Sequence, residues 1–482
     1  MGQDRTINAN PLLLAIFVIA ICGIIYELII GSISSLLLGD SIKQFSITIG
    51  LFMSAMGFGS YMSKHFKQNL FTIFAFIELG IGMLGGLSGI ILFSAYAFTK
   101  VYIMVMYTVI IGIGILVGLE IPIITRIIEN EKNNLRITLA NVLSFDYIGA
   151  LIGSIAFPLL LLKHLGNVRT AFLVGFINIA VAIMVIFKYK GYLKKPGLMK
   201  AISIFCALII LIGFITGRFS ADYIEQQFFR DTIIFKEQTP YQKLVLTANG
   251  NDIRLFINGN IQFSSIDEYR YHESLVHPAM GLGKPREQVL ILGGGDGMAA
   301  REILKYESVK AITLVDLDER VVELGRTNSI LKRLNNGSLD DERVQVANMD
   351  AFKFLETSKK KYDAVFVDLP DPNDESLNKL YTNVFYRLIN SHLTEDGVVV
   401  IQSTSPYFVP KAYWCIRKTI ESEGLYTSGY HVNVPSFGDW GFSIASKKPF
   451  KTSDIKIGVS TRFLTQEIIS ALFYFAKDES VN

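Results

Sequence analysis

Long apolar runs fill most of the first 217 residues, and no other feature of the sequence constrains the fold as strongly. A helix needs about 20 apolar residues to cross the hydrocarbon core of a bilayer. Only 18% of all residues are charged, whereas soluble proteins carry about 25%. The pattern predicts a membrane domain of about seven helices over residues 1–218, with the lipid bilayer as its partner. The runs lie at 11–38, 45–63, 71–94, 101–125, 138–162, 169–187 and 201–217, the last being the shortest.

Acidic residues occur inside these runs, whereas basic residues are missing from the apolar interiors. The acids are Glu27, Glu78, Glu120 and Asp146. Ionisable groups at membrane depth are costly and usually face a cavity or a partner. They therefore suggest a cation site, for example a path for a polyamine or a proton. The alternative is that some lie near an interface and the others are protonated and hydrogen-bonded between helices.

Residues 219–482 have the composition of a soluble protein. Apolar and polar residues alternate over 232–263 around the turns NGND and NGN, which predicts β-hairpins. Together with a helix expected within 264–280, they form a subdomain over residues 219–283. Strand and helix patterns then alternate, which predicts an α/β Rossmann-like domain of the class I methyltransferase type over residues 284–482. The tail at 462–478 is expected to be one further helix.

The stretch VLILGGGDGMAAREIL (289–304) predicts a buried strand, a glycine turn and the start of a helix. Gly293 and Gly295 lack side chains, so the backbone of the turn can approach a ligand closely. Asp296 stands inside the turn, where it would oppose a phosphate, and this argues against a dinucleotide. Asp316 ends the next strand 20 residues later, and a carboxylate there can accept hydrogen bonds from both ribose hydroxyls.

Acidic residues also follow the next two predicted strands. Asp350 can reach an adenine amino group, or it can serve as N-cap of a helix at 351–357. The strand in YDAVFVDLPDPND (362–374) ends in Asp368 and Asp371. Paired carboxylates can hold an ammonium, or one of them can take its proton. Since ligands bind at the carboxyl ends of parallel strands, this acidic crevice suits a cationic nucleoside or an amine.

Other ligand classes find little support in the sequence. The net charge is only +3, and no basic patch is interleaved with aromatic residues, which argues against nucleic acid. The cysteines are Cys22, Cys206 and Cys415, and their wide spacing fits neither a metal site nor a disulfide framework. We therefore expect no metal and no nucleic-acid partner.

Together these motifs resemble the spermidine synthase (polyamine aminopropyltransferase) family. The matching motifs are PYQKLVL, INGNIQFSSIDEYRYHE, GGGDG, VDLDE, MDAF and DLPDP, in the family order over about 232–482. The fusion to an apolar half resembles the membrane-bound branch of that family. The resemblance implies transfer of the aminopropyl group of decarboxylated S-adenosylmethionine to putrescine, which releases 5′-methylthioadenosine and spermidine. It implies no resident cofactor, since the nucleoside is a co-substrate, and it allows a homo-oligomer.

The resemblance also implies a role for each matching position. Donor binding is implied for the turn glycines Gly293 and Gly295, for Gln242, for Asp296 on the aminopropyl ammonium, for Asp316 on the ribose, and for Asp350 with Ala351 on the adenine. Amine binding is implied for Tyr271, His272 and Asp371, and proton acceptance for Asp368. Asp296 and Asp368 would also repel the carboxylate of ordinary S-adenosylmethionine.

The sequence departs from the family pattern at three places. Met298 follows GGGDG where glycine is common, NDES (373–376) replaces GPA, and Phe437 stands where a tyrosine is usual. These differences concern the amine acceptor more than the donor. Two other functions therefore remain open. One is a methyltransferase-like enzyme that uses ordinary S-adenosylmethionine, and the other is a polyamine transporter or sensor whose soluble half binds a nucleoside without turnover.

The charges of the loops conflict with the expected location of the enzyme. Eleven basic residues lie on the side of the N-terminus and four on the other side. The positive-inside rule puts the N-terminus in the cytoplasm, and seven spans would then put the soluble domain outside. Since a cytosolic nucleoside substrate requires the opposite, we expect a multi-pass protein of the cell membrane with a cytoplasmic catalytic domain. The larger set is Arg5, Lys64, Lys67, Arg126, Lys132, Arg136, Lys188, Lys190, Lys194, Lys195 and Lys200, and the smaller is Lys43, Lys100, Lys163 and Arg169.

Overall fold

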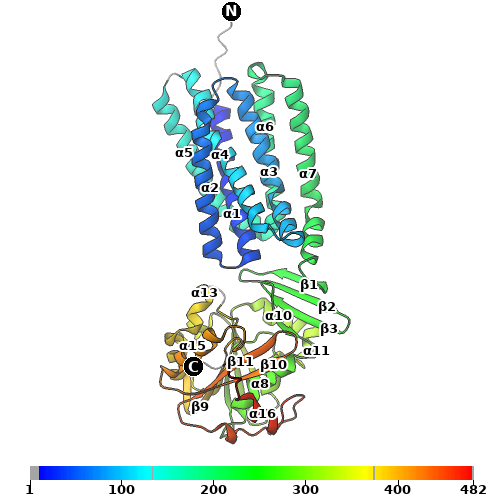
Figure 1. Ribbon diagram of the computed structural model, residues 1–482, viewed down its shortest axis with the longest axis vertical. Coiled ribbons are helices and arrows are strands. Elements are labelled where there is room, and N and C mark those ends of the chain that lie inside the picture. Colours follow the sequence, from blue (N-terminus) through cyan, green and yellow to red (C-terminus); the bar gives the residue numbers. More distant parts are fainter. Residues whose placement is uncertain (1–9, 133, 373–374, 480–482) are drawn as a thin grey trace, which may run out of the picture. The chain divides into compact units, whose positions relative to one another are not determined.

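The chain divides into two compact units between Arg230 and Asp231 (Figure 1). The computed structural model describes residues 10–132, 134–372 and 375–479. The first unit is a helical bundle, and the second is an α/β unit with an additional small sheet. Each unit has its own hydrophobic core, so each is described by itself below.

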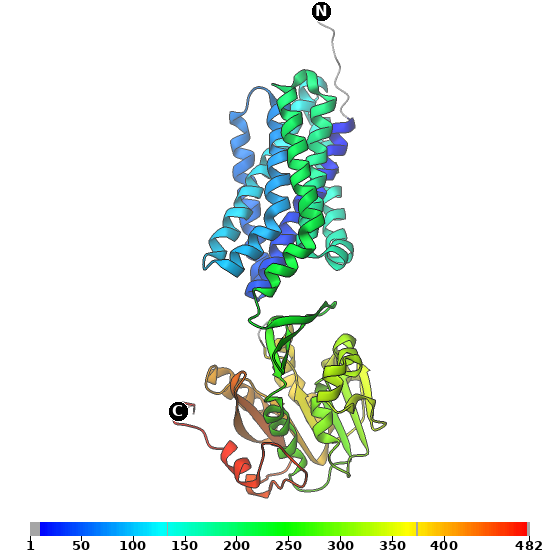
Figure 2. The same cartoon turned by 90° about the vertical axis from the view of Figure 1, so that its right-hand side faces the viewer.

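The bundle consists of long apolar helices that run side by side in both views (Figures 1 and 2). In the described residues they are α1 (Asn10–Leu38), α2 (Ser41–Met62), α3 (Leu70–Phe98), α4 (Tyr102–Lys132), α5 (Leu135–Ala156), α6 (Leu162–Lys188) and α7 (Pro196–Gln226). By length and composition, 6 continuous helical stretches could cross a membrane, because α5 and α6 form one stretch of 54 residues. That stretch breaks at Gly166, which has φ 69° and ψ 176°. A straight helix of this length would reach about 80 Å, whereas a bilayer core is about 30 Å thick.

The prediction for the last apolar run is corrected by the structure. The expected segment was 201–217, whereas α7 extends from Pro196 to Gln226. Pro196 stands in the first turn, where the missing N–H has no helical partner to lose. At the other end, the helix continues nine residues beyond the apolar run and past the predicted domain boundary at residue 218. Hydropathy marks the apolar part of a helix and does not mark where the helix ends.

Glycines allow the backbones of α3 and α6 to touch. A Cβ atom on Gly175 would lie 2.6 Å from the backbone oxygen of Gly82 and 2.8 Å from the Cα atom of Gly86. Small residues at such crossings are typical of helix packing in membranes. The close approach of α3 and α6 brings together polar side chains within the bundle, among them Glu78 and Asn178.

The second unit begins with a small antiparallel sheet in the order β1-β2-β3-β4. Its strands are β1 (Thr232–Gln238), β2 (Lys243–Asn249), β3 (Asp252–Ile257) and β4 (Asn260–Ser264), which are the predicted hairpins. Helix α8 (Glu268–Met280) follows and is almost entirely buried. It carries Tyr271 and His272 toward the carboxyl ends of the larger sheet.

The larger sheet has seven strands in the order β10-β11-β9-β8-β5-β6-β7. The strands are β5 (Gln288–Gly293), β6 (Ala311–Asp316), β7 (Val344–Asn348), β8 (Tyr362–Asp368), β9 (Leu393–Gln402), β10 (Tyr426–Val434) and β11 (Gly438–Ser446). β5 to β9 are parallel, and the β10–β11 hairpin is antiparallel to β9. The helices of this unit are α9 (Met298–Ile303), α10 (Glu319–Thr327), α11 (Ser329–Leu334), α12 (Ala351–Thr357), α13 (Glu375–Asn378), α14 (Asn383–His392), α15 (Pro410–Glu421) and α16 (Gln466–Leu472). Apolar side chains alternate between two cores on the two faces of the sheet.

The predicted helix at 462–478 is largely wrong. Helix α16 covers only Gln466–Leu472, capped by the side chain of Thr465. The reason lies in Glu273, a fully buried residue of α8. Its carboxylate accepts the backbone N–H groups of residues 462, 463 and 464 at 2.6, 2.9 and 3.0 Å. These bonds hold the preceding segment in a turn, so the helix begins only after it.

Candidate active site

The loop between β5 and α9 lies where the carboxyl ends of three neighbouring strands meet. β5 pairs with β6 on one side and with β8 on the other, so the loop runs between Asp316 and Asp368. The backbone of this loop lies very close to both aspartates. A Cβ on Gly293 would lie 2.0 Å from the backbone oxygen of Asp368, and a Cβ on Gly295 would lie 2.6 Å from a carboxylate oxygen of Asp316. Gly293 also has a φ of +86°, which residues with a side chain rarely adopt.

Asp316 directs both carboxylate oxygens at backbone donors. Oδ2 accepts the N–H of Gly295 at 2.9 Å, and Oδ1 accepts that of Asp318 at 2.9 Å. Burial raises the pKa of Asp316 to about 6, against the lowering effect of the two N–H groups. An ionised carboxylate has about four lone-pair sites, so acceptor capacity remains for a ligand.

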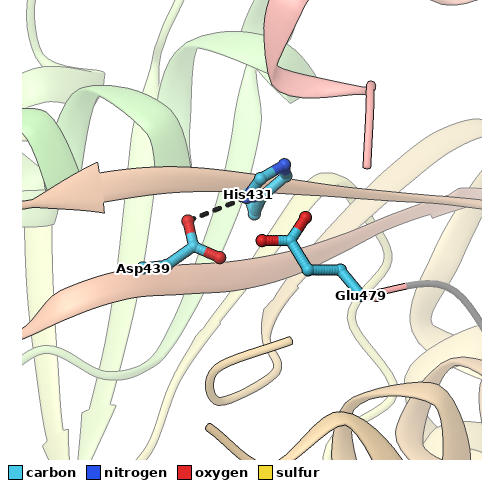
Figure 3. Close-up of side chains that lie close together, drawn as sticks. All are labelled: His431, Asp439 and Glu479. Carbon is cyan, nitrogen blue, oxygen red and sulfur yellow. Dashed lines mark hydrogen bonds and ion pairs between the residues drawn. The ribbon is translucent and has the colours of Figure 1, made fainter. Parts of the chain in front are cut away.

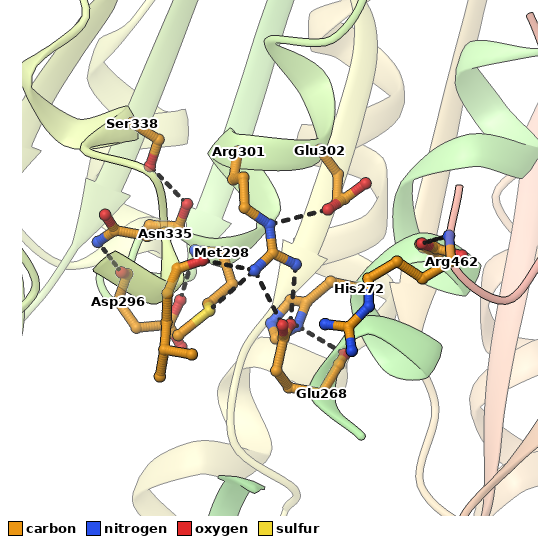
Figure 4. A network of polar contacts seen from close by, with 12 residues as sticks. Glu268, His272, Asp296, Met298, Arg301, Glu302, Asn335, Ser338 and Arg462 are labelled. Carbon is orange, nitrogen blue, oxygen red and sulfur yellow. Dashed lines mark hydrogen bonds and ion pairs between the residues drawn. The ribbon is translucent and has the colours of Figure 1, made fainter. Parts of the chain in front are cut away.

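Asp296 faces the same crevice from inside the glycine turn. Its Oδ1 accepts the N–H of Met298 at 2.8 Å, and its backbone oxygen accepts Nδ2 of Asn335 at 2.7 Å (Figure 4). Its charge acts on Asp316, Asp368 and His272, so Asp296 lies within electrostatic reach of each of these three groups. The structure thus brings together three of the predicted acidic residues.

Asp350 is the N-cap of α12, which is one of the two roles that the sequence left open. Its side chain caps α12 by accepting the N–H of Lys353 at 3.1 Å, and it forms an ion pair with Lys379 at 2.6 Å. Burial alone would raise the pKa of Asp350, but Lys379 and the N–H group hold it below its usual value. Ala351 follows as a buried residue of the first turn. Contact of these two residues with adenine stays a prediction.

Gln242 lies in the turn between β1 and β2, and this turn is anchored next to Asp316. Thr239 accepts the N–H of Gln242 at 3.0 Å and donates its hydroxyl to Asp318 at 2.7 Å. Asp318 follows Asp316 by two residues, so the hydrogen bond fixes the small sheet beside Asp316. The sequence does not predict this pair, because no local pattern connects residues 79 positions apart.

Asp368 ends β8 and is held by Tyr271 of α8. The hydroxyl of Tyr271 donates to Oδ1 of Asp368 at 2.6 Å. Burial and the neighbouring Asp296 raise the pKa of Asp368, whereas His272 and the hydroxyl of Tyr271 lower it in part, and the net shift is upward. A carboxylate with a raised pKa is a better proton acceptor than one in water.

His272 lies behind these acids and is almost fully buried. Its Nδ1 contacts Oε2 of Glu268 at 2.8 Å. Burial alone would lower the pKa of His272, but Glu268 together with Asp296 and Asp368 raises it to about 9. The imidazole is therefore positively charged at neutral pH and offsets part of the negative charge of the crevice.

A buried ion-pair network supports His272 (Figure 4). Arg301 of α9 donates two hydrogen bonds to Glu268, at 2.8 and 2.9 Å, and a third to Glu302 at 2.8 Å. Glu302 in turn contacts Nε2 of His277 at 3.0 Å. Burial opposes ionisation of Glu268, but His272 and Arg301 lower its pKa to about 2. The network links α8 to the helix that starts at the glycine turn.

Asp371, three residues after Asp368, is held by two neutral donors. Gln402, the last residue of β9, donates Nε2 to Oδ1 of Asp371 at 3.0 Å, and Thr404 donates its hydroxyl to Oδ2 at 3.2 Å. Trp440 donates Nε1 to Oε1 of Gln402 at 3.1 Å. Burial raises the pKa of Asp371, and the two donors oppose that shift. Thr404 has a φ of 59°, a strained value for a β-branched residue.

Gln402 and Thr404 were not among the predicted site residues. The signal for Gln402 was present, because it ends a predicted strand next to the strand that ends in Asp368. The rule that placed the acids at strand ends would also have placed Gln402. Thr404 carries no comparable signal, since its backbone conformation is not visible in the sequence.

Comparisons with known proteins decide the family. A family model described as "Spermine/spermidine synthase domain" matches residues 268–456. The chain is 45% identical to the "Polyamine aminopropyltransferase" of Oceanobacillus iheyensis, over 99% of this chain and 94% of that protein. A protein of the same name in Leptospira interrogans is 42% identical over 98% of this chain and 94% of its own length. The chain belongs to the polyamine aminopropyltransferase family.

Both alignments span nearly the whole chain, so these aminopropyltransferase relatives match the apolar half as well as the α/β unit. Among solved structures, "Crystal Structure of Spermidine Synthase in Complex with Transition State Analogue AdoDATO" aligns with a TM-score of 0.48 and 26% identity. That alignment covers 51% of this chain and 86% of the solved chain.

Two departures from the aminopropyltransferase pattern have a packing role. Met298 is fully buried among the apolar side chains that join the small sheet to α10, including Leu246 and Phe263. Phe437 packs edge-on against Tyr271 and Trp440, with ring centroids 6.0 and 5.1 Å away. Phe437 therefore helps to position the tyrosine that holds Asp368. The third departure, 373–376, includes residues 373 and 374, which lie outside the described residues.

One cluster in this aminopropyltransferase has the composition of a metal site but not its hydrogen bonding (Figure 3). His431, Asp439 and Glu479 have potential ligand atoms within 4.8 Å of one another. Both ring nitrogens of His431 are already engaged, Nδ1 with Asp439 at 2.7 Å and Nε2 with the backbone oxygen of Tyr474 at 2.8 Å. Burial opposes protonation, but Asp439 raises the pKa of His431. The cluster attaches the C-terminal segment to the β10–β11 hairpin.

Proposed function

We propose that this chain transfers the aminopropyl group of decarboxylated S-adenosylmethionine to putrescine, producing spermidine and 5′-methylthioadenosine. The observation that carries the proposal is the crevice around the glycine turn. There Asp368 is half-buried, has a raised pKa and is oriented by Tyr271, and both Asp368 and Asp371 act on that tyrosine. These features suit a site that must bind a cation and take a proton.

The donor fits the side of the crevice near Asp316. A carboxylate at this position can accept the ribose hydroxyls, Gln242 would contact the nucleoside, and Asp350 with Ala351 would contact the adenine. Gly293 and Gly295 allow close approach of the sulfonium part. Asp296, inside the turn, would pair with the ammonium of the aminopropyl group, which makes the donor's two positive charges favourable here.

The acceptor fits the side near Asp371. One ammonium of the diamine would pair with Asp371, whose carboxylate is fixed by Gln402 and Thr404. The other nitrogen must be neutral to react. Its lone pair attacks the methylene carbon next to sulfur, the C–S bond breaks, and its electrons remain on sulfur as the thioether of 5′-methylthioadenosine. Asp368 takes the proton lost by the nitrogen, and alignment of the reactants supplies much of the acceleration.

Two other residues tune this chemistry. The cationic His272 lies within electrostatic reach of Asp296 and Asp368, and it lowers the pKa of Asp368 in part against the effect of burial. Tyr271 holds Asp368 in one orientation. Ordinary S-adenosylmethionine carries an additional carboxylate, which would face Asp296 and Asp368. Repulsion between these groups favours the decarboxylated donor and argues against a methyltransferase.

The apolar bundle supports a location in the cell membrane as a multi-pass protein. The bundle has an odd number of long helices, and α1 begins at the end of the bundle opposite to that at which α7 ends (Figures 1 and 2). The positive-inside rule would therefore place the catalytic unit outside. We nevertheless place it in the cytoplasm, because its nucleoside donor is a cytosolic metabolite.

The experiment is a donor choice assay on the full-length protein in detergent. Putrescine is offered with decarboxylated or with ordinary S-adenosylmethionine, and mass spectrometry follows methylthioadenosine, spermidine and methylated amines. We expect spermidine and methylthioadenosine from the decarboxylated donor alone, and a loss of about 100-fold or more in Asp368→Asn. Methylated amines from the ordinary donor would contradict the proposal.

A further inference from the structure

Four polar side chains from different helices meet inside the bundle. They are Tyr26 of α1, Glu78 of α3, Glu120 of α4 and Asn178 of α6, which are 0%, 0%, 4% and 1% exposed. Asn178 donates Nδ2 to Oε2 of Glu78 at 2.9 Å, and the carboxyl groups of Glu78 and Glu120 are hydrogen-bonded to each other. Tyr26 is within electrostatic reach of both carboxyls. Its ring packs on Gly85, which follows Glu78 by two helical turns on the same face of α3.

The cluster leaves hydrogen-bonding atoms without partners. Within the described residues these are the hydroxyl of Tyr26, Oε1 of Glu78, Oε1 of Glu120 and Oδ1 of Asn178. Each buried unpaired polar atom costs about 1–3 kcal/mol, and four in one place are unusual for a folded protein. Three of them are acceptor oxygens, and the fourth is a hydroxyl that can also accept.

The charge of the pair restricts what can fill this place. A hydrogen bond between two carboxyl groups requires at least one proton, and two buried carboxylates in contact cannot both ionise. No basic side chain of the described residues is among the groups that act on either carboxyl. Without a cation the pair is therefore expected to hold both protons and to be neutral. If one proton leaves, a single positive charge must replace it.

The unpaired atoms indicate which cation fits. An alkylammonium group has three N–H donors, and the cluster offers acceptor oxygens on α3, α4 and α6 with the hydroxyl on α1. A proton alone would neutralise the pair but leave the remaining oxygens unpaired. Ca²⁺ and Mg²⁺ prefer six or more oxygen ligands, whereas the unpaired atoms of this cluster in the described residues are four.

We propose that Glu78, Glu120, Tyr26 and Asn178 form a binding site for one alkylammonium group of an amine, separate from the catalytic crevice. Binding exchanges a proton for the amine. The neutral pair releases one proton, the resulting carboxylate pairs with the ammonium, and the remaining proton stays shared between the carboxyls. This site does not depend on the proposed catalytic function, because none of its residues belongs to the α/β unit.

The test measures binding of labelled putrescine to the full-length protein in detergent by equilibrium dialysis. We expect two sites per chain in the wild type and one in Glu120→Gln, which retains the catalytic site. The matched control is Glu27→Gln, which changes a buried acid of α1 that does not act on the pair and should keep both sites. Tyr26→Phe, which keeps the ring, should weaken the second site roughly 5–10-fold.

A second readout separates a binding role from a structural one. Addition of putrescine to the wild type should release one proton per second-site amine and reduce the infrared band of protonated carboxyl groups. Both signals should be missing in Glu120→Gln, although its aminopropyl transfer stays within twofold of the wild type. Equal stoichiometry in the wild type and Glu120→Gln would overturn the proposal, as would a carboxyl band that putrescine does not change. If the wild type itself shows no aminopropyl transfer, this result would count against the catalytic proposal and not against the second site.

Discussion

Replacing Tyr271 by phenylalanine should change the proton affinity of Asp368 with little change in packing. The hydroxyl donates to Oδ1 of Asp368 at 2.6 Å, in a site where Tyr271 is only 9% exposed. A hydrogen bond to a charged group contributes about 1.5–3 kcal/mol, and tenfold in an equilibrium constant corresponds to about 1.4 kcal/mol. Loss of the bond destabilises the ionised form of Asp368, so its pKa should rise further.

The consequence is a displaced pH profile. Asp368 must be ionised to take a proton, so activity is lost as the pH falls through its pKa. In Tyr271→Phe the acidic limb of kcat/KM should therefore move upward by about one to two pH units. On the alkaline side of this limb, kcat should stay within a few-fold of the wild type, because Asp368 is then ionised in both enzymes.

The assay follows release of methylthioadenosine at saturating decarboxylated donor across the pH range. Tyr381→Phe is the matched control, because this hydroxyl bonds to the backbone oxygen of Pro370 and to Gln402 and does not bond to Asp368. Its acidic limb should keep the wild-type position. An unmoved limb in Tyr271→Phe, or equal displacement in both variants, would refute the assignment of Asp368 as the proton acceptor oriented by Tyr271.

Three further outcomes follow from the structure. Gln402→Ala removes the donor to Oδ1 of Asp371, so the KM for the diamine should rise roughly tenfold while donor affinity, measured by calorimetry, stays the same. The pKa of His272 is raised from 6.5 to about 9. Its contribution to folding is therefore complete below pH 6.5 and lost as the pH rises through about 9, which thermal unfolding should show as a decline of up to about 3 kcal/mol that His272→Asn removes. Cys415 is exposed on the catalytic unit, whereas Cys22 is buried and Cys206 is half-buried, so in Cys206→Ser a membrane-impermeant maleimide should label Cys415 only after cells are permeabilised; labelling of Cys415 in intact cells would place the catalytic unit outside.

Part of the site could be predicted because ligands bind at the carboxyl ends of parallel strands. Parallel strands with short patterns of apolar residues place their last residues at one edge, so Asp316 and Asp368 come together without knowledge of any long-range contact. The glycine turn lies between them for the same reason. What these residues bind stays a prediction, because their position does not identify a ligand.

The supporting contacts could not be predicted in this way. Arg301 and Glu268 are 33 residues apart on two helices, and both look like ordinary surface charges in the sequence. Only the packing of α8 against α9 buries them and makes the ion pair necessary. The same holds for Glu273, whose three bonds to backbone N–H groups delay the start of the predicted C-terminal helix. Local patterns predict elements, whereas buried polar partners depend on how the elements pack.

Burial acts on acids in both units, but the surroundings lead to different chemistry. In the crevice, the charge of His272 and the hydroxyl of Tyr271 compensate for burial, so Asp368 can ionise and accept a proton during turnover. Around Glu78 and Glu120 no such cation acts among the residues that the structure describes, and Asn178 supplies one neutral donor. A carboxyl pair in that setting keeps its protons until a cation arrives to replace one of them. The same residue type therefore fits a general base in one unit and a cation-exchange site in the other, and the difference is set by whether the protein supplies the positive charge itself.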